Sequence, residues 1–248
     1  MNMSRHLVAM ITLFGATICH AREVSVGFGD HIPPYVLPES QSGLEVEVFR
    51  AALAFHGHVM VPQYFPLKRV GDMFKLGKID AAMWDSGTDL ADDGIYAEPA
   101  VVYDNVFITR SDRHFTIRKP DDLKGHSVLA FQGALAGYPF WLSGVARSGG
   151  YREVNNQTMQ SLALHQGECD VVFTDRYIFR YFTKLMLSEH RINPAPLQEH
   201  SVVQPDPKVF RAIFRDPEIK RDYEDGLAHL KENGDYRALQ LKYGITPR

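Results

Sequence analysis

Cysteine is nearly absent from this chain, with two residues among 248. Cys19 lies in an N-terminal segment that we expect to be removed, so Cys169 would remain without a partner for an intramolecular disulfide. Cys169 lies in a predicted apolar strand over residues 169–174, and we interpret it as a packing residue and not as a nucleophile. The scarcity of cysteine therefore excludes a fold built on disulfides.

The motifs of common enzyme and cofactor sites are missing as well. The chain has no Gly-x-Ser-x-Gly, no His-Glu-x-x-His and no Walker loop. Its histidines are scattered, and His56 with His58 form an isolated pair, which is a weak zinc signal. We therefore predict no metal and no cofactor. The formal net charge of −3 gives no reason to expect a nucleic acid or an anionic membrane surface as partner.

Long apolar runs are also scarce, and the only one lies at the N-terminus. Arg5 precedes an apolar stretch over residues 7–18, and the small residue Ala21 follows, which is the order of a secretory signal peptide. The stretch is too short for a comfortable membrane span. We predict a signal peptide over residues 1–21 and a periplasmic protein. The alternatives are a buried N-terminal element and lipidation at Cys19, which the bulky Ile18 disfavours.

The first half of the mature chain alternates between strand-like and helix-like segments. Predicted strands cover residues 24–28, 59–64 and 79–84, and an apolar run follows at 101–109. Residues 44–56 have helical spacing between the first two strands. The order β-α-β-α-β predicts a mostly parallel, doubly wound sheet, and the mature length suits one large domain or two small lobes.

The pattern then restarts in the second half. A buried strand over residues 169–174 ends on Asp175, and residues 175–187 continue with helical spacing. In open α/β sheets ligands bind at the carboxyl ends of strands, so Asp175 could meet a positive group of a ligand. Asp is also a favoured N-cap, and Asp175 could simply cap the helix that it precedes. Residues 77–85 repeat the same arrangement upstream and end on Asp85.

Aromatic and acidic residues are predicted near the same strand ends. Carboxylates beside aromatic faces suit an ammonium or guanidinium group, although many of these rings could equally belong to the core. The acids and rings that we expect near a ligand are Asp30, Asp85, Asp175, Tyr35, Trp84 and Phe131.

Several segments, in this order and spacing, resemble the extracellular solute-binding proteins of family 3, the polar amino-acid-binding components of ABC importers. The resemblance covers nearly all the mature chain, and the segments that carry it are residues 43–48 after a Pro-Pro-aromatic turn, 77–81, 120–125, Asp170 with Asp175, and 227–244. It implies an α/β fold of the periplasmic-binding-protein type II class, with two doubly wound lobes joined by two hinge strands. Residues 22–108 plus 205–248 would form lobe one and residues 109–204 lobe two, with crossings near 108–111 and 201–204. Closure of such a hinge would bury the ligand.

The resemblance also implies roles for individual residues. Asp175 matches the family's ammonium-binding carboxylate. The family's Thr-x-x-Arg is missing, because residues 84–93 contain no Arg, and its hydroxyl-bearing turn is replaced by the turn at Gly133 and Ala134. Backbone N–H groups after Gly133 could still meet an anion. Arg69 could replace the missing Arg or could be a solvated charge at a helix start.

We hypothesise that the ligand is an amino acid or a related cationic amine bound by Asp175. Its carboxylate, if it has one, would be held by Arg69 and the turn at Gly133. The expected partner is an ABC permease in the inner membrane, and we expect a monomer. A soluble sensor for a membrane receptor and a periplasmic dehydratase-like enzyme of the same fold are the alternatives. An enzyme would need a general acid or base such as His31, but a histidine in a turn is more often merely exposed.

Overall fold

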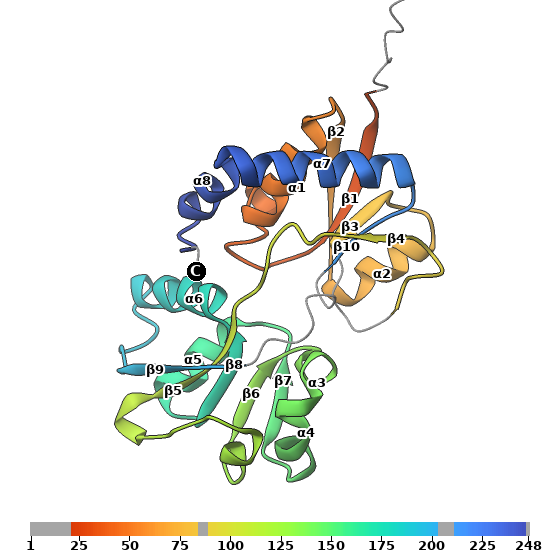
Figure 1. The fold of residues 1–248 in the computed structure, drawn as a ribbon. Helices are drawn as coiled ribbons and strands as arrows, with labels where there is room; N and C mark the ends of the chain where they lie inside the picture. Colours follow the sequence, from red (N-terminus) through yellow and green to blue (C-terminus); the bar gives the residue numbers. More distant parts are fainter. Residues whose placement is uncertain (1–20, 84–88, 203–210, 247–248) are drawn as a thin grey trace, which may run out of the picture.

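In the computed structural model of the chain, residues 21–83, 89–202 and 211–246 are described. They form two five-stranded sheets with their own helices, and we call each sheet with its helices a lobe (Figure 1). The sheet of lobe one has the order β2-β1-β3-β10-β4 and contains β1 (Glu23–Gly29), β2 (Val59–Phe65), β3 (Ala81–Met83), β4 (Ile95–Ala97) and β10 (Ala212–Phe214). The sheet of lobe two has the order β7-β6-β8-β5-β9 and contains β5 (Asn105–Arg110), β6 (Val128–Phe131), β7 (Tyr151–Val154), β8 (Val171–Asp175) and β9 (Leu197–Ser201).

Both sheets combine parallel and antiparallel pairs. In lobe one, β1 is parallel to β2 and β3, whereas β10 is antiparallel to β3 and β4. In lobe two, β6 is parallel to β7 and β8, whereas β5 is antiparallel to β8 and β9. The parallel strands of one sheet end at the same edge, so the residues that follow them collect at that edge.

The helices cover the sheets of both lobes. Lobe one carries α1 (Leu44–Ala54), α2 (Leu67–Lys75), α7 (Pro217–Asn233) and α8 (Asp235–Lys242). Lobe two carries α3 (Ala134–Gly137), α4 (Pro139–Arg147), α5 (Thr158–Gln166) and α6 (Arg176–Ser188). Short 3-10 turns are present at Pro38–Ser40, Ser111–Arg113 and Pro120–Leu123.

Local sequence signals explain where the long helix α7 begins and ends. The side chain of Asp216 accepts hydrogen bonds from the backbone N–H groups of Glu218 and Ile219, at 2.7 and 3.3 Å, and Pro217 is the first helical residue. Gly234 ends the helix in the left-handed conformation, with φ of 90°.

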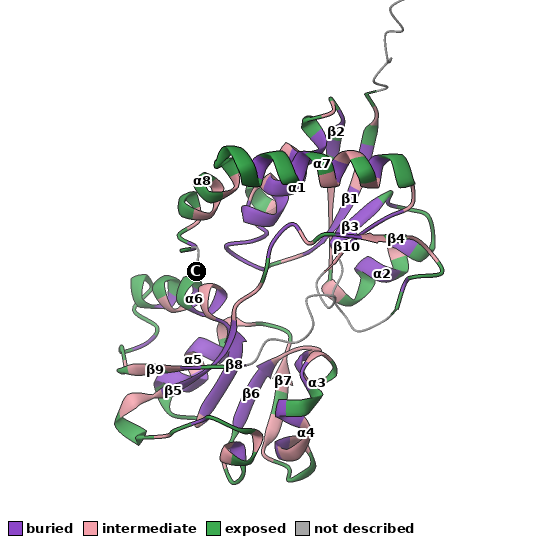
Figure 2. Cartoon of the chain, in the orientation of Figure 1, coloured by how far each residue is buried: buried purple, intermediate pink, exposed green. Residues whose placement is uncertain are grey.

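The cores lie between the sheets and their helices, and most strand residues are buried (Figure 2). The main core cluster of lobe one includes Phe28, Phe49 and Tyr223. Two residues of α6, Ile178 and Phe182, belong to this same cluster although their helix starts from the sheet of lobe two. The two lobes therefore share an apolar contact at α6.

The predicted fold class is confirmed, with one correction to the path of the chain. The passage between the lobes was expected near residue 108, but that position lies inside β5, which pairs with β8 and β9 over its whole length. The first passage therefore precedes Asn105. The apolar pattern of residues 101–109 identifies a buried strand, but it carries no information about which sheet the strand joins. The second expected crossing, at 201–204, extends beyond the described residues.

The short strands were the hardest to predict. β4, β7 and β10 have three or four residues each, too few to show a periodic pattern. Within the described residues, no helix combines the length and the apolar character that a membrane crossing requires.

Candidate functional site

A cleft of about 870 Å³ lies between the two lobes. Lobe one lines it with the loop after β1 and the start of α2, including Asp30 and Lys68. Lobe two lines it with α6 and with the loops after β6 and β7, including Gln132 and Asn156. These segments follow the carboxyl ends of parallel strands in both sheets, which is where α/β folds bind ligands.

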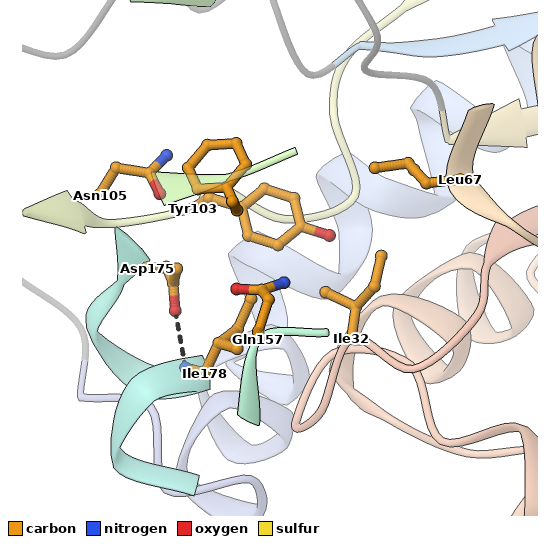
Figure 3. Close-up of a pocket in the computed structure, with 8 residues that line it drawn as sticks. Ile32, Leu67, Tyr103, Asn105, Gln157, Asp175 and Ile178 are labelled. Carbon is orange, nitrogen blue, oxygen red and sulfur yellow. Dashed lines mark hydrogen bonds between the residues drawn. The ribbon is translucent and has the colours of Figure 1, made fainter. Parts of the chain in front are cut away.

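A smaller pocket of about 60 Å³ adjoins the cleft, since Ile32, Leu67, Phe131 and Gln157 line both. Figure 3 shows side chains from both lobes converging on it. The remaining lining residues are Tyr103, Asn105, Asp175 and Ile178. Among the described residues that line this inner pocket, only Asp175 has an ionisable carboxyl group.

Asp175 is held by four hydrogen bonds from the protein itself. Its Oδ1 accepts the backbone N–H groups of Tyr177 and Ile178, at 2.8 and 3.0 Å, and so caps α6 (Figure 3). Its Oδ2 accepts the N–H of Asp104 at 2.6 Å and the hydroxyl of Tyr35 at 3.1 Å. Burial raises the pKa of Asp175 to about 6, although these four donors act in the opposite direction.

Tyr35 connects the lobes through this carboxylate. It lies in the loop between β1 and α1, its side chain is fully buried, and its ring centroid is 4.5 Å from that of Tyr103. Burial, and then the charge of Asp175, raise the pKa of Tyr35 well above its usual value, so its hydroxyl stays protonated and donates. The bond from Tyr35 to Asp175 therefore joins lobe one to lobe two.

A second buried carboxylate lies behind the first. Glu45, in the first turn of α1, is 2 % exposed and accepts the hydroxyl of Tyr103 at 2.7 Å. Burial raises the pKa of Glu45 to about 7, and the bond from Tyr103 lowers it in part. Tyr103 belongs to the segment that joins β4 to β5, so this bond ties the passage between the lobes to lobe one.

The turn after β6 is occupied by a side chain of the neighbouring strand. The N–H groups of Gly133 and Leu135 donate to the carboxylate of Glu153 on β7, at 2.8 and 3.0 Å. The hydroxyl of Tyr151 also donates to Glu153, at 2.7 Å. Burial raises the pKa of Glu153, but these donors and the charge of Lys68 on the facing lobe together lower it. Glu153 is therefore a carboxylate that uses these backbone donors.

The structure brings some of the predicted site residues together and separates others. Phe131 lines both the cleft and the inner pocket, and half-buried Asp30 lines the cleft. Arg69 is exposed and is not among the lining residues, whereas its neighbour Lys68 is. Trp84 and Asp85 lie outside the described residues. Tyr35, Gly133 and Ala134 are not lining residues either, but Tyr35 donates a hydrogen bond to Asp175 and Gly133 donates one to Glu153.

Several residues with a place in the site were missed from the sequence, including three with polar side chains. Asn105 and Gln157 supply amide groups to the inner pocket, and Glu153 occupies the turn after β6. Asn105 starts a strand and Gln157 precedes a helix, so both follow the rule that site residues lie at the ends of elements. The role of Glu153 has no local signal, because its partners lie 18 and 20 residues away.

No family model matches the chain, and no curated protein matches it in sequence. Solved structures do match. An ancestral arginine-binding protein bound to arginine has a TM-score of 0.67 and 17% identity, over 89% of this chain and 97% of that one. A histidine kinase sensor domain with similarity to periplasmic binding proteins gives 0.67 and 20%, over 92% and 99%. The arginine-, lysine-, histidine-binding protein of Geobacillus stearothermophilus gives 0.66 and 17%, over 91% and 97%. The chain therefore has the two-lobed fold of the periplasmic binding proteins, which its resemblance to the solute-binding proteins of family 3 predicts.

Proposed function

We propose that the protein is a periplasmic solute-binding protein, which captures a small solute of the amino-acid or amine class by closing its lobes and delivers it to an ABC permease. The observation that carries the proposal is a cleft whose walls come from both lobes. A solute that contacts both walls stabilises the closed arrangement over any other, and this difference in affinity is what shifts the equilibrium between two states.

Similar structures support the amino-acid class as the first to test. They were solved with arginine, glutamine or glutamate bound. Aromatic and amide side chains at the inner pocket, including Phe131 and Gln157, fit a solute with an apolar body and a hydrogen-bonding group.

Closure can be measured by energy transfer between dyes on the two lobes. Ser148 follows α4 in lobe two and Glu232 lies on α7 in lobe one, and both are exposed, so each can be replaced by Cys and labelled. The native Cys169 is buried and burial raises its pKa to about 12, which keeps it from reacting with the dyes. Addition of arginine, glutamine, glutamate or their amides should change the transfer efficiency saturably. If no small solute changes it, the proposed capture mechanism is wrong.

A sensor role is the second candidate, because the match to a histidine kinase sensor domain covers 92% of this chain and 99% of that one. Both roles use the same closure, so the partner decides between them. Genes for a permease and an ATPase next to the coding gene, and stimulation of ATP hydrolysis by the closed protein, would support import. A neighbouring receptor gene and no effect on an importer would support sensing.

A further inference from the structure

The acid of the inner pocket has no acceptor site left for a ligand. An ionised carboxylate offers about four lone-pair sites, and Asp175 uses them for two cap N–H groups, the N–H of Asp104 and the hydroxyl of Tyr35. Asp175 is 2 % exposed and Tyr35 0 % exposed. A ligand ammonium would have to displace the Tyr35 hydroxyl and leave it buried without its acceptor. Such a loss makes binding through Asp175 unfavourable.

The backbone donors on the opposite wall are used in the same way. The N–H groups of Gly133 and Leu135, which could hold an incoming carboxylate, donate to Glu153. A second carboxylate at this turn would find its donors taken and would be repelled by Glu153. Lys68 faces Glu153 from lobe one, so this lining cation of the cleft already interacts with an internal acid. These contacts lower the affinity for a ligand carboxylate, because proteins reject a partner by leaving its charge unpaired or repelled.

Apart from Asp175, the described residues that line the inner pocket are uncharged. Its apolar walls are Ile32, Leu67, Phe131 and Ile178, and its other polar side chains are the hydroxyl of Tyr103 and the amides of Asn105 and Gln157. An isolated charge placed among such groups loses its hydration without a matching gain, whereas an apolar or amide group does not.

We propose that the solute presents an uncharged group, aliphatic or amide-like, to this pocket, and that a free ammonium and free carboxylate are not its anchors. Groups of the chain itself occupy both places, the Tyr35 hydroxyl at Asp175 and the Glu153 carboxylate at Gly133. The inference rests on the proposed function and narrows its solute class to amino-acid or amine derivatives that do not depend on these two charges for binding. A cavity of about 150 Å³ accepts benzene, and this pocket of about 60 Å³ is smaller, so its occupant is a small end group and not an aromatic ring.

Four probes that share the leucine side chain separate the effect of the ammonium from that of the carboxylate. L-leucine carries both charges, N-acetyl-L-leucine only the carboxylate, L-leucinamide only the ammonium, and N-acetyl-L-leucinamide neither. Binding is measured by calorimetry on protein that has been unfolded and refolded to remove any solute from the cells. We expect N-acetyl-L-leucinamide to bind at least about tenfold more tightly than L-leucine, since one misplaced charge-assisted contact corresponds to that factor.

Two variants test separately the two side chains of the protein that occupy these places, Glu153 and Tyr35. Glu153→Ala frees the N–H donors of the turn at Gly133. It should raise the affinity for N-acetyl-L-leucine by about tenfold or more, without raising the affinity for L-leucinamide. Tyr35→Phe frees one acceptor site on Oδ2 of Asp175. It should raise the affinity for L-leucinamide without raising the affinity for N-acetyl-L-leucine. Glu168→Ala removes an exposed acid of lobe two, and Tyr64→Phe removes a hydroxyl without a hydrogen-bond partner among the described residues, so they are the matched controls. Circular dichroism confirms that each variant is folded.

The outcomes distinguish this inference from the function on which it rests. If L-leucine, L-arginine or L-glutamine binds the wild type more tightly than N-acetyl-L-leucinamide, and the dyes report closure, the uncharged anchor is refuted while solute capture stands. An unchanged order of the four probes in Glu153→Ala and Tyr35→Phe also refutes it. If neither these four probes nor the amino acids close the lobes, the proposed function fails and the inference fails with it.

Discussion

Replacing Asp175 by Asn removes a buried charge and leaves the shape of the side chain unchanged. The amide oxygen of Asn can still accept the cap N–H groups of Tyr177 and Ile178, because Asn is as good an N-cap as Asp. On the other side, the amide nitrogen can donate to the Tyr35 hydroxyl, which is free to rotate. The N–H of Asp104 loses its acceptor. The variant should therefore fold, and the effect of the charge can be read separately from that of the shape.

The size and sign of the effect follow from the pKa of Asp175. Burial raises it from an ordinary value of 3.8 to about 6, so the folded state holds the proton more tightly than the unfolded chain does. As the pH rises from 3.8 to 6, the unfolded chain loses its proton first, and the free energy of unfolding of the wild type decreases. At about 1.36 kcal/mol for each pH unit between the two values, the decrease is about 3 kcal/mol. Asp175→Asn does not titrate and should show no such decrease.

The measurement is urea unfolding of both proteins at pH 4.5, 5.5, 6.5 and 7.5, followed by circular dichroism. The free energy of unfolding of Asp175→Asn minus that of the wild type should rise with pH, mostly below pH 6.5, and then stay constant. Glu232→Gln, which changes an exposed acid on α7, controls for the loss of one negative charge. A difference that stays flat within about 0.5 kcal/mol, or falls as pH rises, would show that the carboxylate is not buried as the hydrogen bonds indicate.

Three further predictions concern other buried positions. Glu45→Gln keeps an acceptor for Tyr103 and removes a carboxyl group whose pKa burial raises from 4.5 to about 7. In urea unfolding, the free energy of unfolding of the variant minus that of the wild type should therefore rise by about 3 kcal/mol between these pH values. Gly226→Ala should lower the free energy of unfolding by about 2 kcal/mol or more, because an added Cβ would clash with the carbonyl oxygen of Ala52 on α1; an unchanged melting temperature would contradict this packing. Cys169 should react with Ellman's reagent at pH 8 only in denaturant, and rapid reaction of the native protein would show that it is not buried.

Asp175 shows which features of the site can be predicted from the sequence and which cannot. Its position was predictable, because a buried strand, a capping residue and a helix are consecutive in the chain, and the structure has this order at β8 and α6. Its hydrogen bond with Tyr35 was not predictable, because the two residues are 140 positions apart and meet only when the lobes are assembled. The same holds for β5, whose sheet depends on pairing with β8 and β9. Local patterns therefore locate the site, and contacts between distant segments decide which of its groups remain available.

These distant contacts also indicate where the proposed closure would pivot. The first turn of α6 is attached to lobe one at three points: Tyr35 bonds to Asp175, Ile178 packs in the core of lobe one, and the Tyr177 hydroxyl donates to the carbonyl of Thr246 at 3.0 Å. A rotation of the lobes that broke all three would expose apolar surface and leave buried polar groups without partners, which is unfavourable. The closure that we propose would therefore turn about the start of α6. The inner pocket, which Asp175 and Ile178 line, would lie close to this pivot, and the cleft walls away from α6 would move relative to one another.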